Sequence, residues 1–291
     1  MTGATGQLSL SLAERAAVFP QLHVSTVGRP TVHFEQPDAL RDAILQHRPE
    51  VLINAAAYTA VDQAEVEPEL AELVNAKAPG VLACAAAELG IPIIHLSTDY
   101  VFDGTGTGPY AENALTAPKS VYGRTKLAGE EAVRFASPMA MIVRTSWVYS
   151  PFGRNFVKTM LALAETRDEI GVVADQFGTP TSALGLADGL LTAVCRWRDG
   201  ERTGQGETYH LAGQETASWY DVARAIFAYA AELSLPTATV RPIATADYPT
   251  RAARPANSAL DSGKFARDFS FGLVSWQESV RQVVDRIASA V

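Results

Sequence analysis

Short apolar runs alternate with longer amphipathic stretches through the first half of the chain. Four of these runs are rich in β-branched residues and predict strands, at residues 23–28, 51–57, 92–102 and 140–149. Apolar residues at helical spacing predict helices over residues 6–18, 37–48, 68–89 and 119–136. Strands separated by helices indicate βαβ crossovers, and therefore a parallel sheet with helices on both faces. Runs that are almost wholly apolar fit strands buried on both sides.

The pattern is less regular after residue 150. Turn-rich stretches at residues 175–181 and 247–258 interrupt shorter elements. Helices are predicted at residues 184–198, 218–233 and 275–289. We therefore predict two units, a main α/β unit and a smaller α/β lobe. The main unit covers residues 1–149 and 184–212, and the smaller lobe covers residues 150–183 and 213–291.

The chain begins with Met1 directly before a glycine-containing turn, so no apolar run precedes that turn. In a doubly wound sheet the strand at this place is central, and its neighbours pair with it on both sides. We therefore expect the first strand to be missing and the sheet to be split there. Our hypothesis is that Met1 occupies the last position of that strand and that the start codon was assigned late. Upstream codons that encode no apolar run would contradict it.

Composition and charge restrict the function classes. Apolar residues make up 47% and charged residues 19% of the 291 residues, which is typical of a globular protein. The net charge of −8 argues against a nucleic-acid partner, because such proteins normally present a basic face. The two cysteines and five histidines show no ligand spacing, so we expect no metal. Without a signal pattern or a membrane-length apolar run, we expect a cytoplasmic protein without membrane contact.

The turn at residues 3–6 (GATG) is a candidate site for a dinucleotide phosphate. Glycine permits a tight turn and a close approach of the backbone to pyrophosphate, and amides at the following helix start point toward the anion. Ser9 stands where a third glycine is commoner. Arg29 follows the second predicted strand, where a basic residue accommodates the 2′-phosphate of NADPH. The alternative interpretations are an ordinary surface turn and a solvated loop arginine.

A tyrosine and a lysine four residues apart form the strongest candidate for chemistry. Tyr122 and Lys126 open a predicted helix and would share one of its faces. An unperturbed tyrosine has a pKa of about 10, and a nearby ammonium would lower that pKa by stabilising the phenolate. Thr98 lies at the carboxyl end of the preceding predicted strand, from which its hydroxyl could orient a carbonyl oxygen. The Tyr-x-x-x-Lys spacing is common by chance, and it becomes specific through this βαβ context.

These motifs together resemble those of the extended short-chain dehydrogenase/reductases, and among them the enzymes that reduce dTDP-activated keto-sugars. The resemblance spans nearly the whole chain in order, which is far more specific than any one motif. The matching stretches are TGATGQL (2–8), NAAAYTAVDQAE (54–65), NAKAPGVLA (75–83), HLSTDYVFDG (95–104), VYGRTKLAGE (121–130), RTSWVYSPFGRNFVKTML (144–161), DQFGTPTS (175–182) and YPTRAARPANSALD (248–261). The resemblance implies a Rossmann-type doubly wound parallel sheet that binds NADP, with the smaller lobe binding the substrate.

The implied reaction is the reduction of the C4 keto group of dTDP-4-dehydro-β-L-rhamnose to dTDP-L-rhamnose by NADPH, with NADH possible. Thr98, Tyr122 and Lys126 would be catalytic, with Tyr122 donating the proton and Lys126 also holding the nicotinamide ribose. Further cofactor contacts would come from Gly3, Thr5, Gly6, Gln7, Leu8, Arg29, Ala55, Ala56 and Ala57. The sugar nucleotide would contact Thr59, Val61, Tyr100, Trp147, Asn155, Arg251 and Arg254. The last two suit a diphosphate, because guanidinium groups bind phosphate in a bidentate manner.

Some positions depart from the family pattern. His33 and Phe34 stand where an acid and an apolar residue are common near the adenine. Ser11 and Leu184 stand where some members hold magnesium between subunits with glutamates, so we expect no metal and a monomer or weak homodimer. Three alternatives stay open: another NAD(P)-dependent nucleotide-sugar reductase or epimerase, a non-catalytic regulatory relative, and an inactive fragment.

Overall fold

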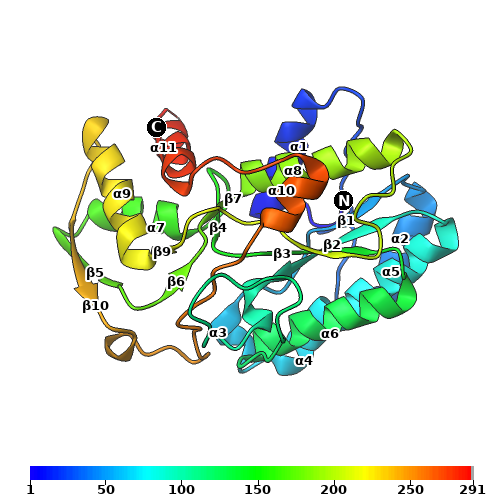
Figure 1. Cartoon of the computed structure of the whole chain (residues 1–291), viewed down its shortest axis with the longest axis horizontal. Helices are drawn as coiled ribbons and strands as arrows, with labels where there is room; N and C mark the ends of the chain where they lie inside the picture. Colours follow the sequence, from blue (N-terminus) through cyan, green and yellow to red (C-terminus); the bar gives the residue numbers. More distant parts are fainter. Residues whose placement is uncertain (290–291) are drawn as a thin grey trace.

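The structure, a computed structural model, describes residues 1–289 (Figure 1). Its main sheet contains four parallel strands, in the order β1-β2-β3-β8. Every residue of the central strand β2 is buried, as expected for a sheet that is covered on both faces. The strands are β1 (Leu52–Asn54), β2 (Ile93–Thr98), β3 (Met141–Thr145) and β8 (Thr208–His210).

Helices cover both faces of this sheet, which confirms the predicted doubly wound α/β class. Side chains alternate across a strand, so Ile94 and Val143 enter one core while Ile93 and Ile142 enter the other. The first core contains residues of α1 (Gln7–Arg15), α8 (Ala183–Arg198) and α10 (Gly263–Phe269). The second contains residues of α2 (Pro37–His47), α5 (Ala78–Leu89) and α6 (Val121–Ala136).

Local sequence signals account for several ends of the predicted helices. Pro37 occupies the first turn of α2, where its missing N–H costs nothing. Gly90 ends α5 with a φ of +68°, a left-handed conformation that glycine adopts without a Cβ penalty. Ser218 caps α9 (Trp219–Glu232) by accepting a hydrogen bond from the Asp221 amide. These ends were predictable because the capping groups are neighbours in sequence.

The helix predicted over residues 68–89 is continuous in three segments: α4 (Pro68–Glu72), a π-helical turn (Leu73–Lys77) and α5. By length and composition alone, Pro68–Leu89 could cross a membrane, contrary to the expectation that no such run exists. Just over half of its most apolar 18-residue window is buried inside the protein. That burial comes from packing against α2 and α6. The apolar character of this helix is therefore accounted for by the core of the main unit.

The strand predicted at residues 23–28 does not form. Only Val27 pairs there, through a single parallel bridge to Thr2, which also bridges Asn54. Thr2 donates its amide to the Ile53 carbonyl, and Val27 donates its amide to Met1. Residues 1 and 2 thus lie between these two segments, where the central strand was expected. A strand is held by its ladder partners, so this short pairing leaves residues 23–26 outside the sheet.

The smaller lobe lies at the opposite end of the molecule from the main sheet (Figure 1). Its core contains residues of α7 (Phe156–Ala164), α9 and α11 (Trp276–Ala288), packed with the parallel pair β5 (Glu169–Val173) and β10 (Thr239–Ile243). Helices α7 and α10 and this strand pair were not predicted. Two further pairs join β4 (Val148–Tyr149) to β7 (Thr181–Ser182) and β6 (Phe177–Gly178) to β9 (Ala217–Ser218). Short helical turns lie at Ala16–Val18, Val61–Ala64, Asp99–Val101 and Thr245–Asp247.

The run predicted as one strand over residues 140–149 is divided into β3 and β4. Trp147 separates them with a φ of +48°, in the left-handed region that bulky residues rarely adopt. The run at 92–102 likewise ends as a strand at Thr98, where a helical turn begins. Both interruptions lie at the carboxyl ends of parallel strands, which is where α/β proteins bind their ligands.

Candidate active site

A cleft of about 900 Å³ follows the carboxyl ends of β1, β2 and β3. It extends from the glycine turn before α1 to the loop that leads into α7. All predicted site residues except two arginines line it. Those that do are Gly3, Thr5, Gly6, Gln7, Leu8, Arg29, Ala55, Ala56, Ala57, Thr59, Val61, Thr98, Tyr100, Tyr122, Lys126, Trp147 and Asn155.

The glycine turn forms a cradle that side chains would fill. Gly3 has a φ of +85°, and a Cβ there would lie 2.9 Å from the Ser9 hydroxyl. A Cβ on Gly28 would lie 3.3 Å from the backbone of Gly3, so both glycines permit close packing of main chain. No side chain caps the start of α1 at Gly6. The first amides of that helix therefore face the cleft with the positive end of the helix dipole, which fits the pyrophosphate of a dinucleotide.

Arg29 is in the cleft but is not an isolated cation. It forms an ion pair with Glu35, which sequence reasoning missed and which also lines the cleft. The Arg29 side chain is 66% exposed, so it is free to turn toward a phosphate. In the sequence, Glu35 is marked only by being an acidic residue directly after Phe34.

Tyr122 lies on the first turn of α6, one helical turn before Lys126. Ser120 caps this helix by accepting a hydrogen bond from the Gly123 amide at 3.1 Å. A Cβ on Gly123 would overlap the Tyr100 carbonyl, so this glycine allows α6 to approach the segment after β2. As a result the rings of Tyr122 and Tyr100 meet edge to face at 5.4 Å. The structure thus brings the predicted tyrosine and lysine beside the end of β2.

The electrostatics of this pair differ from the prediction. Burial raises the pKa of Tyr122 above its usual range, and the Thr98 hydroxyl opposes that shift only in part. Lys126 was expected to lower the pKa of Tyr122, but its ammonium donates to the Leu96 carbonyl at 2.6 Å instead. Burial lowers the pKa of Lys126 to about 8, against the charge of Glu130, which raises it. The tyrosine is therefore protonated and the lysine largely charged at neutral pH.

Asp99 is a cleft residue that sequence reasoning missed. It is 3% exposed, and its Oδ1 accepts a hydrogen bond from the Thr98 hydroxyl at 2.8 Å. Its Oδ2 has no partner among residues 1–289. Burial raises the pKa of this carboxyl to about 7, and hydrogen bonds from Thr98 and neighbouring groups oppose the shift. The only signal in the sequence was an acid directly after the end of a predicted strand.

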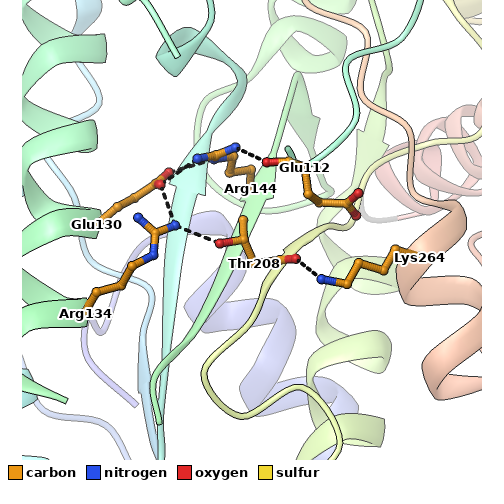
Figure 2. A network of polar contacts seen from close by, with 6 residues as sticks. All are labelled: Glu112, Glu130, Arg134, Arg144, Thr208 and Lys264. Carbon is orange, nitrogen blue, oxygen red and sulfur yellow. Dashed lines mark hydrogen bonds and ion pairs between the residues drawn. The ribbon is translucent and has the colours of Figure 1, made fainter. Parts of the chain in front are cut away.

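A buried ionic network lies on α6, one turn beyond Lys126 (Figure 2). Glu130 is fully buried and binds Arg144 of β3 through both carboxylate oxygens, at 2.9 and 2.8 Å. Arg134 also binds Glu130, at 3.2 Å, and donates to Thr208 of β8 at 2.7 Å. The network therefore joins α6 to two strands of the sheet. Figure 2 shows its six members: Glu112, Glu130, Arg134, Arg144, Thr208 and Lys264.

The residues predicted to bind the sugar nucleotide lie at different places. Asn155 caps α7 and donates to the Gln7 side chain at 3.0 Å, which places it beside the glycine turn. Arg254 lies outside the large cleft, where it pairs with Asp62 and donates to the Tyr100 hydroxyl at 3.4 Å. Arg251 is exposed and does not line the cleft.

The fold and the site together define a class. A glycine cradle at the carboxyl edge of a doubly wound sheet, beside a tyrosine–lysine pair and a threonine hydroxyl, is typical of short-chain dehydrogenase/reductases. The family model described as RmlD substrate binding domain matches residues 1–289. The chain belongs to this family, which confirms the resemblance seen in the sequence.

Similar proteins cover almost the same length. A protein of Sinorhizobium fredii (strain NBRC 101917 / NGR234) named dTDP-4-dehydrorhamnose reductase is 45% identical, over 98% of this chain and 95% of its own. The crystal structure of a dTDP-4-dehydrorhamnose reductase from Clostridium acetobutylicum matches with a TM-score of 0.89 and 36% identity, over 98% of each chain. A third, from Bacillus anthracis in complex with NADP, matches with a TM-score of 0.89 and 34% identity, over 98% of this chain and 97% of its own.

Proposed function

We propose that this chain reduces the C4 keto group of dTDP-4-dehydro-β-L-rhamnose to dTDP-L-rhamnose, using NADPH in preference to NADH. The observation that carries the proposal is a buried Tyr122, one helical turn before Lys126, in the same cleft as the glycine cradle. The names of the similar proteins and the NADP complex of the Bacillus anthracis protein support it. We place the reaction in the cytoplasm, as a step in supplying rhamnose for surface polysaccharide.

In this proposal one end of the cleft binds the cofactor and the other end binds the substrate. We assign residues 1–149 and 184–212 to the cofactor, with the glycine turn holding the pyrophosphate, Ala55–Ala57 flanking the adenine and ribose, and Arg29 meeting the 2′-phosphate. We assign residues 150–183 and 213–291 to the substrate, with α10 of this range packed in the core of the main sheet. The hexose is flanked by Thr59, Val61, Tyr100 and Trp147, and the diphosphate lies near Asn155, Arg251 and Arg254. Both arginines lie outside the large cleft, so in this proposal they turn toward the diphosphate to balance its charge.

When bound, the reduced nicotinamide supplies the hydride that C4 of the sugar accepts. Tyr122 donates its hydroxyl proton to O4, so that the carbonyl becomes a secondary alcohol. Burial raises the pKa of Tyr122, so its hydroxyl is neutral and carries the proton that a general acid must donate. Thr98 orients O4 from the end of β2, and Lys126 holds the nicotinamide ribose.

The proposal includes no metal, no nucleic-acid partner and no membrane partner, and a monomer or weak homodimer. The net charge of −8 supports the absence of nucleic acid. The packing of Pro68–Leu89 against α2 and α6 supports the absence of a membrane span. Sedimentation with and without a chelator tests the oligomeric state and the metal together.

The direct test is the consumption of NADPH with enzymatically prepared dTDP-4-dehydrorhamnose, followed by absorbance. Tyr122→Phe removes the proton donor, and we expect kcat to fall by about 10²–10⁴-fold. Tyr229→Phe on α9 is the matched control, because it also loses one hydroxyl but packs against the core of the smaller lobe, away from the cleft lining. Equal activity of the Tyr122 variant and the native chain would contradict the assignment.

The open alternatives give different results in this assay. An epimerase would carry tightly bound nicotinamide through purification and would not consume added NADPH. A regulatory relative would bind NADPH without turnover, and its binding would be unchanged in Tyr122→Phe. Reduction of another keto-sugar, with none of dTDP-4-dehydrorhamnose, would keep the reaction class and replace the substrate.

A further inference from the structure

Trp147 has an unusual backbone for a residue that lines the cleft. Its φ of +48° lies in the left-handed region, which a bulky side chain adopts only when its surroundings enforce it. The residue lies between β3 and β4, so its conformation divides what would otherwise be one strand. Something outside this strand must therefore hold the indole in place.

Three contacts hold that indole, and the closest is an aromatic stack. The Trp219 ring lies parallel to the Trp147 ring, with a centroid distance of 3.5 Å and an interplanar angle of 5°. The Trp147 Nε1–H donates to the Ser258 hydroxyl at 3.1 Å. Gly178 faces the same ring, and any Cβ at this position would overlap it. All three partners belong to the smaller lobe.

Trp219 does not line the cleft itself. It is the first residue of α9, directly after β9, and β9 pairs with β6 at Gly178. Phe156 of α7 packs against it at 4.7 Å, with the rings tilted by 51°. Phe156 of the smaller lobe thus supports the Trp219 ring, and the Trp219 ring stacks on Trp147. Any effect of Trp219 on a ligand in the cleft passes through Trp147.

We propose that Trp219 is a positioning residue for the sugar end of the cleft, holding the Trp147 indole where the hexose binds. This inference rests on the proposed function. A hexose presents C–H groups on its ring faces, and a 6-deoxy sugar adds a methyl group. A fixed indole face suits such a surface, because a rigid aromatic ring loses little entropy when it makes an apolar contact. The smaller lobe, rather than the main sheet, then sets the width of the sugar site.

Substitutions at two positions test the inference with turnover. In Trp219→Leu the indole of Trp147 loses its support, and we expect KM for the keto-sugar to rise about tenfold. The Kd for NADPH should stay within about twofold, because Trp219 does not line the cleft. Trp219→Phe keeps a flat ring and should restore most of the affinity. Gly178→Ala pushes the Trp147 ring from its place while both tryptophans remain, and should raise KM in the same way.

Circular dichroism of the protein without ligand provides a readout that does not depend on turnover. Stacked indoles couple their transitions, so the native chain should show an exciton couplet. Gly178→Ala should abolish it, whereas Trp197→Phe and Gly108→Ala should preserve it. Trp197 lies on α8, and a Cβ on Gly108 would meet nothing within 4 Å.

The outcomes separate this inference from the proposed function. A native chain without a couplet, or an unchanged KM in Trp219→Leu, overturns the positioning role. A parallel loss of NADPH affinity and thermal stability in Trp219→Leu also overturns it, since that result shows a general structural role. A couplet without consumption of NADPH overturns the proposed function and leaves the stack intact.

Discussion

Two buried carboxylates, Asp99 in the cleft and Glu130 on α6, have opposite electrostatic environments. Glu130 is fully buried, and burial alone would raise its pKa, but the bonds and charges of Arg144 and Arg134 bring that pKa below its usual range. Asp99 is 3% exposed and faces the cleft with hydrogen bonds but no cation, and its pKa rises to about 7. The two groups are equally removed from water, so the partner charge decides the direction of the shift.

The difference separates a carboxylate that is bound through both oxygens from one that is bound through a single oxygen. Glu130 has both oxygens bound and joins α6 to β3, so it holds the helix that carries Tyr122 and Lys126. Asp99 lines the cleft, and its Oδ2 has no hydrogen-bond partner within 3.5 Å among residues 1–289. Buried polar atoms are nearly always satisfied in proteins, so an exception with a shifted pKa indicates a working site. Glu130, which holds α6 in place, has both carboxylate oxygens bound by Arg144, whereas Asp99 accepts a side-chain hydrogen bond through Oδ1 alone.

The largest expected effect comes from breaking the buried ion pair between Glu130 and Arg144. Arg144→Met leaves Glu130 buried without its bidentate partner, and we expect the free energy of unfolding to fall by about 3–5 kcal/mol. Chemical denaturation measures it. Arg281→Met is the matched control, since Arg281 and Glu232 are both more than half exposed and their pair contributes about 1 kcal/mol or less. Equal losses in the two variants would show that burial of the pair does not matter.

The second prediction concerns Asp99 and the dependence of the free energy of unfolding on pH. The native state binds the Asp99 proton more tightly than the unfolded chain, whose carboxyl has a pKa near 3.8. The stability that this group contributes is therefore fully present below about pH 4 and is lost as the pH rises to about 7. Asp99→Asn removes that loss, which amounts to roughly 4 kcal/mol at pH 8.

Urea unfolding of the native chain and of Asp99→Asn at several pH values measures this slope. Asp42→Asn is the control, because Asp42 is 77% exposed and should leave the slope unchanged. If the free energy of unfolding depends on pH in the same way in the native chain and in Asp99→Asn, the pKa of Asp99 is not raised in the folded protein.

The smallest expected effect concerns Arg134, the second arginine that binds Glu130. Arg134 is 39% exposed, and Arg144 still satisfies both oxygens of Glu130 when Arg134 is absent. Arg134→Gln should therefore lower the free energy of unfolding by about 1 kcal/mol or less. A loss as large as that of Arg144→Met would mean that the half-exposed arginine, not the buried one, compensates Glu130.

Local rules made much of the fold predictable from the sequence. The alternation of apolar runs and amphipathic stretches determined the order of strands and helices and the doubly wound class. Pro37, Gly90 and Ser218 marked helix ends because their capping partners lie within a few residues. The spacing of Tyr122 and Lys126 placed them on one face of α6 for the same reason. Most predicted site residues line one cleft, since the carboxyl ends of parallel strands meet at one edge of a sheet.

Only the tertiary structure decided the features that depend on distant partners. Residues 23–26 form no strand because a ladder needs a neighbouring strand, and this segment has a single bridge, from Val27 to Thr2. The pKa of Asp99 and that of Glu130 diverge because cations from β3 and α6 reach only the second. Trp147 takes a left-handed backbone because Trp219, from the other lobe, stacks on it. Sequence spacing records local geometry, whereas burial, ion pairing and stacking are properties of the packed chain.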